Sequence, residues 1–142
     1  MAFNPVYADS AFLYALVNKR DSVHPSAVES LRNVVIAQRP VVTTDYVLAE
    51  ALTLAKARAG SVAAIRLLDR LEASDVVSIE WIGPQRFESA KAFFRKHADH
   101  GYSFTDCTSF VVMRELGITD ALTIDHHFIE AGFKALLPVS SR

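Results

Sequence analysis

Cysteine is scarce in this chain, because Cys107 is the only one. A single cysteine excludes an intramolecular disulfide and a zinc site built on cysteine ligands. No uninterrupted apolar run approaches the ~20 residues of a membrane-spanning helix. The first residues, MAFNPVYADS, lack the basic and then apolar order of a signal peptide. We therefore expect a cytoplasmic protein that makes no use of a membrane.

The chain also lacks a marked excess of charge of either sign. Its 15 Lys and Arg residues and 16 Asp and Glu residues give a net charge of -1, which argues against a generally basic surface for nucleic acid. Hydrophobic residues make up 51% and charged residues 22% of the 142 residues, as in ordinary globular proteins. We expect a single domain over residues 1–142 with one hydrophobic core.

Strand and helix patterns alternate along the chain. Apolar spacing and capping residues predict strands over residues 3–8, 40–43, 76–82, 121–124 and 134–137. They predict helices over residues 10–19, 26–38, 45–59, 61–73, 85–97, 105–116 and 126–131. Thr44 and Ser61 are the expected N-caps of two helices, and Gly83-Pro84 is expected to end a strand. Strands separated by helices need crossover connections, so we predict an α/β fold whose mainly parallel sheet is covered on both faces.

Two aspartates directly follow expected strands. Asp9 comes after VYA, and Asp125 comes after ALTI. In open parallel sheets, binding sites lie outside the carboxyl ends of the strands. Each aspartate also stands at an expected helix start, where an N-cap or a partner of the helix dipole is the alternative interpretation.

Two further acids lie on the apolar sides of expected helices. Glu50 shares its side with Val47 and Leu54, and Asp106, in the stretch YSFTDCTSF, shares its side with Phe110. An ionised carboxylate in such a setting is costly unless a cation, a metal or hydrogen bonds compensate it. The alternative for each is a boundary position from which the carboxylate reaches water.

These four acids are expected to converge at one end of the sheet. Like charges at close range cannot all stay ionised without a cation, and oxygen ligands suit Mg²⁺ or Mn²⁺. The sequence therefore predicts a site for Mg²⁺ (or Mn²⁺) held by Asp9, Glu50, Asp106 and Asp125. A zinc site with His126 and His127 is the alternative, although adjacent residues do not share a side of a helix or strand.

Four segments surround the four acids: VYADSAFLYAL, TTDYVLAEALTL, SFTDCTSFVVMRELGI and ALTIDHHFIEAGF. In their order, spacing and flanking residues, the chain resembles PIN-domain proteins, specifically the VapC-type toxin ribonucleases, over nearly its whole length. The resemblance implies a three-layer α/β/α sandwich and an endoribonuclease that depends on Mg²⁺ or Mn²⁺. It also implies an RNA substrate, a homodimer and a VapB-type antitoxin partner.

One position departs from the family pattern. Many PIN relatives carry another acid two residues after the fourth one, where this chain has His127. Thr123 matches the small hydroxyl residue that the family often places before the fourth acid, and it could orient metal-bound waters. Ser10 and Thr105 are further candidates for fixing the carboxylates by hydrogen bonds.

The implied reaction is hydrolysis of an RNA phosphodiester bond by a metal-activated water, which leaves a 5′-phosphate and a 3′-hydroxyl. The competing route uses the RNA 2′-hydroxyl and leaves a 2′,3′-cyclic phosphate. Two alternatives to a toxin are a housekeeping RNA-processing nuclease without an antitoxin and a catalytically silent module that binds RNA or protein. A haloacid-dehalogenase-like phosphatase would need an aspartate where this chain has Ala11.

Two surfaces are expected to meet partners. The helices over residues 45–59 and 61–73 carry more aliphatic residues than one core face needs, which favours a symmetric dimer contact. An antitoxin segment is expected in a separate apolar groove beside Phe12, Leu13 and Leu16.

Basic and aromatic side chains outside the acid set have two interpretations each. Arg86 and Lys91 are among six basic residues that are available to face an RNA backbone, and a solvated surface is the alternative. Trp81 alternates with Ile79 and is expected to pack, whereas an exposed tryptophan could stack on a base.

Overall fold

The computed structural model describes residues 4–139 and contains one parallel sheet of five strands. The strands are β1 (Val6–Ala8), β2 (Val41–Thr44), β3 (Val77–Glu80), β4 (Asp120–Leu122) and β5 (Lys134–Ala135). Their order across the sheet is β3-β2-β1-β4-β5. The strand β1 is completely buried at the centre and pairs with β2 and β4. The predicted parallel sheet is confirmed.

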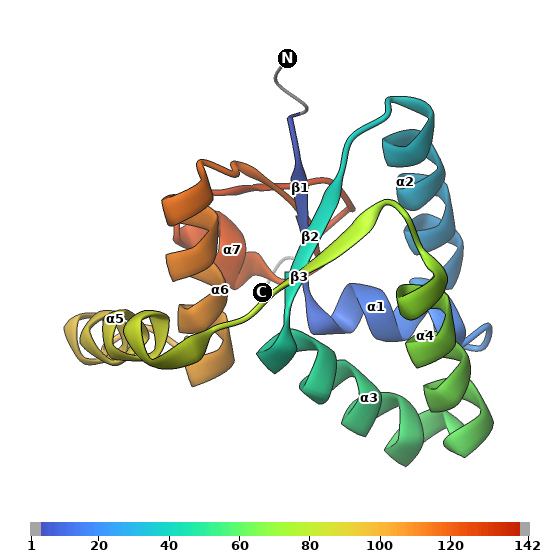
Figure 1. Ribbon diagram of the computed structural model, residues 1–142, viewed down its shortest axis with the longest axis horizontal. Helices are drawn as coiled ribbons and strands as arrows, with labels where there is room; N and C mark the ends of the chain where they lie inside the picture. The colour runs from blue at the N-terminus through green and yellow to red at the C-terminus, as the bar shows by residue number, and fades with distance from the viewer. Residues whose placement is uncertain (1–3, 140–142) are drawn as a thin grey trace.

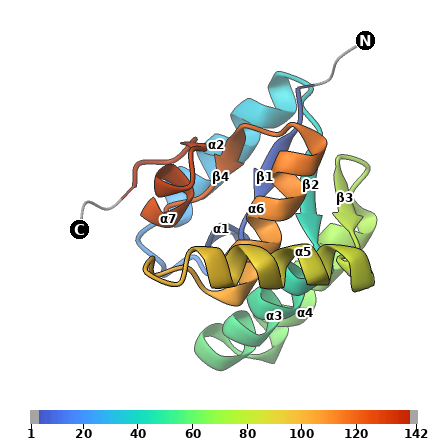
Figure 2. The same cartoon turned by 90° about the vertical axis from the view of Figure 1, so that its left-hand side faces the viewer.

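Helices cover both faces of this sheet. They are α1 (Ser10–Val17), α2 (His24–Ile36), α3 (Asp45–Ala59), α4 (Ser61–Ala73), α5 (Gly83–Lys96), α6 (Phe104–Leu116) and α7 (His126–Glu130). In Figure 1, α1, α2 and α4 lie on one side of the strands, and α5, α6 and α7 lie on the other. The helix α3 runs below the carboxyl ends of the strands, and Figure 2 shows α5 and α6 in front of the sheet. The three-layer α/β/α sandwich is therefore confirmed.

The central strand ties the layers together through its side chains. Tyr7 is fully buried, and its hydroxyl donates a hydrogen bond of 2.7 Å to Ser109 Oγ on α6. Phe12 and Leu67 are buried on the α1 and α4 side, and Phe110 is buried on the α6 side. Each such side chain contributes roughly 1.5–3 kcal/mol through burial. The carboxyl ends of the central strands are thus held in place by a packed core.

Two helix starts differ from the expectation. Gly83 and Pro84 were expected to end the preceding strand before a helix that starts at residue 85, but they already form the first turn of α5. A proline is well suited there, because a backbone N–H in the first turn has no partner within the helix. The proline ring also fixes φ at a helical value. The N-cap of α4 is Gly60 rather than Ser61, and its φ of 94° lies in the region that favours glycine. Thr44 caps α3 as predicted.

The other boundaries agree with the expected ranges to within two residues, except at the start of β1. That strand begins at Val6, three residues after the expected start, and residue 3 lies outside the described residues.

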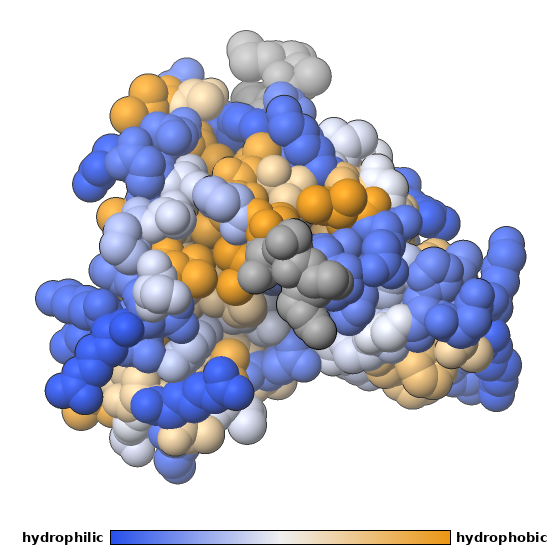
Figure 3. Space-filling model, turned by 180° about the vertical axis from the view of Figure 1, so that it is seen from behind, coloured by the Kyte–Doolittle hydropathy of each residue, from blue (hydrophilic) through white to orange (hydrophobic). Residues whose placement is uncertain are grey.

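Among the described residues, no helix is long and apolar enough to cross a membrane. Seen from behind, the surface is largely hydrophilic around a central group of hydrophobic residues (Figure 3).

Candidate active site

The carboxyl ends of β1 and β4 lie side by side at the point where the strand order changes direction. From β1 the chain moves outward to β2 and β3, whereas β4 and β5 lie on the opposite side of β1. Ala8 pairs with Leu122, so the next residues, Asp9 and Thr123, are neighbours across the ladder. A change of direction of this kind opens a crevice at the edge of a parallel sheet.

Asp9 lies at the bottom of this crevice and is 6% exposed. One carboxylate oxygen accepts a hydrogen bond of 2.9 Å from the backbone N–H of Phe12, and the other accepts one from the hydroxyl of Thr123. Burial first, and then the charges of Asp125 and Asp106, raise the pKa of the Asp9 carboxyl to about 7 despite these hydrogen bonds. The ionised form of Asp9 is therefore costly until a positive charge compensates it.

Thr123 connects the aspartates that follow the two strands. Its hydroxyl donates to Asp9 and accepts a hydrogen bond of 2.9 Å from the backbone N–H of Asp125. Asp125 in turn accepts 2.9 Å from the backbone N–H of His127 and is the N-cap of α7. Asp9 is likewise the N-cap of α1. The N-cap interpretation is thus correct for both, and the two carboxylates still face one crevice.

Asp106 is fixed by a reciprocal capping arrangement at the start of α6. Its Oδ2 accepts a hydrogen bond of 3.0 Å from the backbone N–H of Ser103, and Ser103 Oγ accepts 2.9 Å from the N–H of Asp106. Burial raises the pKa of the Asp106 carboxyl, and the charge of Asp125 adds to this shift. Ser103 was not among the expected residues, although the spacing Ser-x-x-Asp before an apolar run was a readable signal.

Glu50 reaches the same crevice from α3 and is exposed. Its Oε1 accepts a hydrogen bond of 2.5 Å from the hydroxyl of Ser10. Ser10 therefore does bond to a carboxylate. Within residues 4–139, no hydrogen bond joins the hydroxyl of Thr105 to a carboxylate, and Ser103 holds Asp106 instead.

The structure brings the four acids together around one cavity of about 290 Å³. The acids that line it are Asp9, Glu50, Asp106 and Asp125, and Ser10, Thr105 and His127 line it with them. Carboxylate oxygens are the ligands that Mg²⁺ and Mn²⁺ prefer. The donor set therefore fits a hard divalent cation, and the catalytic and metal-binding roles of these residues stay predictions.

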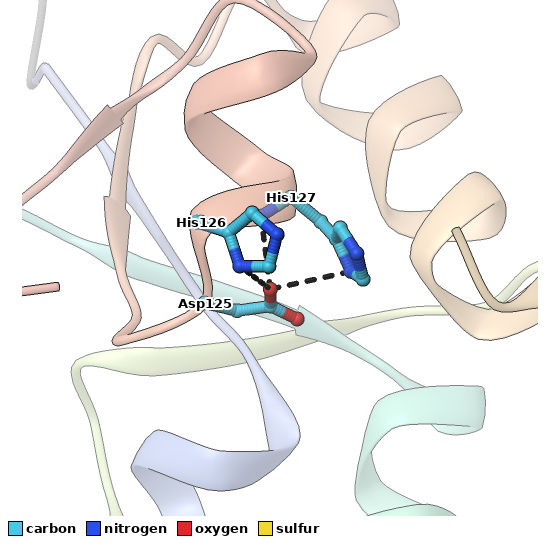
Figure 4. A group of neighbouring side chains, drawn as sticks. All are labelled: Asp125, His126 and His127. Atoms are coloured by element: carbon cyan, nitrogen blue, oxygen red, sulfur yellow. Dashed lines mark hydrogen bonds and ion pairs between the residues drawn. The ribbon is translucent and has the colours of Figure 1, made fainter. Parts of the chain in front are cut away.

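Two histidines stand beside this acid cluster. Possible ligand atoms of Asp125, His126 and His127 all lie within 4.8 Å of one another, and Figure 4 shows both rings around the Asp125 carboxylate. His126 Nε2 lies 3.2 Å from Glu130 Oε2, whereas His127 Nδ1 lies 3.4 Å from Asp106 Oδ2. The two adjacent rings thus have different partners, Glu130 and Asp106, although both lie close to the Asp125 carboxylate.

Comparison with known proteins agrees with this geometry. The PIN domain family matches residues 6–134. The chain is 35% identical over 134 residues to the 23S rRNA-specific endonuclease VapC20 of two Mycobacterium tuberculosis strains, CDC 1551 / Oshkosh and H37Rv, and the match covers 94% of this chain and 98% of the relative. The crystal structure of Mycobacterium tuberculosis VapC20, described as a sarcin-ricin loop cleaving toxin, has a TM-score of 0.82 and 34% identity, with 94% of this chain and 99% of that one covered. The chain belongs to the PIN-domain family and to its VapC branch.

Proposed function

We propose that this protein is a metal-dependent endoribonuclease that acts as the toxin of a type II toxin–antitoxin pair. The observation that carries the proposal is the convergence of four carboxylates in one cavity at the switch point of the sheet. The similarity to VapC20, which is named an endonuclease for 23S rRNA, supports it. A catalytically silent module would have no need to keep such a costly set of charges together.

Asp9, Asp106 and Asp125 would hold Mg²⁺ or Mn²⁺, and Glu50 would complete the set. The raised pKa values of Asp9 and Asp106 support this assignment, because burial and mutual repulsion disfavour their ionised forms until a cation is present. When bound, such a cation stabilises charge on the phosphoryl oxygens and lowers the pKa of a water molecule.

The side chains themselves would orient the substrate and move one proton. Glu50 is exposed and oriented by Ser10, so it is placed to accept the proton of the attacking water. The hydroxyl of Thr123 bonds to both the Asp9 carboxylate and the backbone N–H of Asp125, and so fixes the position of Asp9 relative to the start of α7. In-line attack by water would leave a 5′-phosphate and a 3′-hydroxyl on the RNA.

The substrate we infer is ribosomal RNA, and specifically the sarcin-ricin loop of the large-subunit RNA. This inference rests on the names of the relatives, which match this chain over 94% of its length.

Arg86 does not support an RNA-binding role. Its guanidinium forms ion pairs of 2.9 Å with Glu80 and 2.8 Å with Glu115, and the side chain is only 18% exposed. Arg86 therefore joins β3 to α6.

A homodimer is proposed through the outer surface of α3, α4 and β3. Trp81 is 70% exposed, so the expectation that it packs inside the protein is wrong. It borders an apolar depression with Leu48, Leu52, Leu68 and Ile79. Exposed apolar surface of this kind commonly marks a protein contact, and a symmetric contact would cover Trp81 in both subunits.

The antitoxin is proposed to use a different surface. Phe12, Leu13 and Leu16 of α1 line an apolar groove of about 140 Å³ together with Leu67 and Leu71 of α4. An apolar segment of a VapB-type partner would fit this groove, which Arg70 also lines. A toxin that acts on ribosomes would work in the cytoplasm, which is the location we propose.

The direct test is cleavage of RNA in purified ribosomes. We expect cleavage with Mg²⁺ or Mn²⁺, none in EDTA, and a loss of at least about 100-fold in Asp106→Asn. Asp75→Asn, which changes an exposed acid outside the site, is the matched control. Undiminished cleavage by Asp106→Asn would refute the assignment of the site. Cleavage outside the sarcin-ricin loop, mapped by primer extension, would refute only the inferred substrate.

The toxin role and the housekeeping alternative differ in one further measurement. A toxin stops growth when it is expressed alone, and coexpression of the small open reading frame beside its gene restores growth. If no neighbouring reading frame suppresses the activity, the housekeeping nuclease becomes the better account.

A further inference from the structure

His127 stands out among the described residues, because it alone has a buried side-chain polar atom without a hydrogen-bond partner. This atom, Nδ1, lies 3.4 Å from Asp106 Oδ2 and 3.3 Å from Asp125 Oδ1. A buried polar atom without a partner is costly. Its position between two carboxylates of the site therefore calls for a physical reason.

The imidazole ring is held in this position from the outside. A Cβ atom on Gly101 would lie 3.0 Å from His127 Nε2, so a larger residue there would require the ring to shift. The Tyr102 ring packs edge-on against the imidazole, with centroids 5.6 Å apart and planes at 86°. The loop thus covers the Nε2 edge of the ring while the Nδ1 edge faces the carboxylates.

The two distances from His127 Nδ1 match shared coordination. Two ligand atoms on one ion with bonds of about 2.1 Å lie roughly 3.0–3.4 Å apart in octahedral or tetrahedral geometry. We infer that His127 Nδ1 is a nitrogen ligand of the divalent cation that Asp106 and Asp125 hold. The inference rests on the proposed function, because it concerns the metal site of that function. The alternative is an imidazolium ion that pairs with the same two carboxylates.

A nitrogen ligand changes which ion the site prefers. Mg²⁺ strongly favours oxygen ligands, whereas first-row transition ions accept imidazole more readily, Mn²⁺ the least among them. A carboxylate at this position would supply an oxygen ligand instead. The presence of His127 therefore favours Mn²⁺ over Mg²⁺, and His127→Asp should shift the preference back toward Mg²⁺.

His126 provides a matched control one position away on the same helix. Its Nε2 is engaged by Glu130 at 3.2 Å, and its Nδ1 lies 3.8 Å from Asp125 Oδ1. Figure 4 shows the two rings on different sides of the Asp125 carboxylate. His126→Gln removes an imidazole close to the acids and leaves the proposed ligand in place.

The experiment is pulsed electron paramagnetic resonance of the full chain loaded with Mn²⁺, which detects nitrogen nuclei bound to the ion. We expect ¹⁴N modulation in the wild-type protein and in His126→Gln, and its loss in His127→Gln and His127→Asp. In competition titrations, the Mg²⁺ concentration that displaces half of the Mn²⁺ should fall at least about tenfold in His127→Asp.

Each outcome of this experiment decides the inference. Bound Mn²⁺ without ¹⁴N modulation in the wild-type protein would overturn the ligand role of His127 and leave the proposed nuclease standing. Loss of the modulation in His126→Gln, with retention in His127→Gln, would show that His126 is the ligand and would overturn the inference. A wild-type protein that binds no divalent ion would overturn both this inference and the proposed metal dependence. The wild-type spectrum decides the question even if a variant does not fold.

Discussion

Replacing Asp9 with asparagine should stabilise the metal-free protein at alkaline pH. Asp9 is 6% exposed, and its pKa is raised from 3.8 to about 7. Because the folded state binds the Asp9 proton more tightly than the unfolded state does, the wild-type protein loses stability as pH rises from about 4 through about 7. At about 1.4 kcal/mol for each pKa unit, this loss amounts to about 4 kcal/mol when complete.

Asparagine removes that penalty and introduces a smaller one. It keeps an oxygen that can accept from the N–H of Phe12, but it cannot accept the hydroxyl hydrogen of Thr123 as the carboxylate does. A weakened buried hydrogen bond costs about 1–2 kcal/mol. The net gain for Asp9→Asn above about pH 8 is therefore about 2 kcal/mol, and it should turn into a small loss near about pH 4.

The assay is urea unfolding in EDTA at about pH 5 and about pH 8, with Asp75→Asn as the control. The stability difference between Asp9→Asn and the wild-type protein should grow by about 3 kcal/mol between these two pH values. Mn²⁺ should then stabilise the wild-type protein and have little effect on Asp9→Asn. If Asp9→Asn is less stable than the wild-type protein at both pH values by the same amount, the account of a repelled, buried carboxylate is wrong.

Three further substitutions test other parts of the account. Thr123→Val keeps the shape of the side chain but leaves Asp9 without its hydroxyl donor, so we expect a loss of about 2 kcal/mol in urea unfolding and of about tenfold in nuclease rate; an unchanged rate would contradict its role. Arg86→Ala should cost about 1 kcal/mol, and less at high salt, because the partner Glu115 is partly exposed and its pKa is lowered by this hydrogen bond; the pair should also weaken as Glu115 takes up a proton at low pH. Trp81→Arg should convert a dimer into a monomer in light scattering. An unchanged mass would show that the dimer contact lies on another surface.

The elements and the acid cluster could be predicted because their signals are local. Asp9 and Asp125 stand directly after buried strands, and a parallel sheet places the ends of its strands at one edge. Glu50 and Asp106 each interrupt an apolar helix side. Once the alternation of strands and helices indicated a parallel sheet, the convergence of these residues followed from the topology.

Other features depend on contacts between distant segments. The alternating pattern around Trp81 predicts a strand, but it does not show whether another segment of the chain covers the Trp81 side chain. In the structure, that side chain is exposed. Gly83-Pro84 is compatible with both a break and a helix start, and the packing of α5 on α6 decides between them. The position of His127 depends on the loop at Gly101, 26 residues earlier, which lies against its ring. No local pattern contains that information.

The chemistry of the RNA ends made by the purified protein decides whether the four carboxylates hold a cation for hydrolysis by water. We expect a 5′-phosphate and a 3′-hydroxyl, formed with Mg²⁺ or Mn²⁺, absent in EDTA and lost in Asp106→Asn. Ligation-based sequencing with and without prior phosphatase or kinase treatment distinguishes these ends from the products of 2′-hydroxyl attack. A 2′,3′-cyclic phosphate formed at full rate in EDTA would contradict the claim that four carboxylates hold the cation for hydrolysis by water.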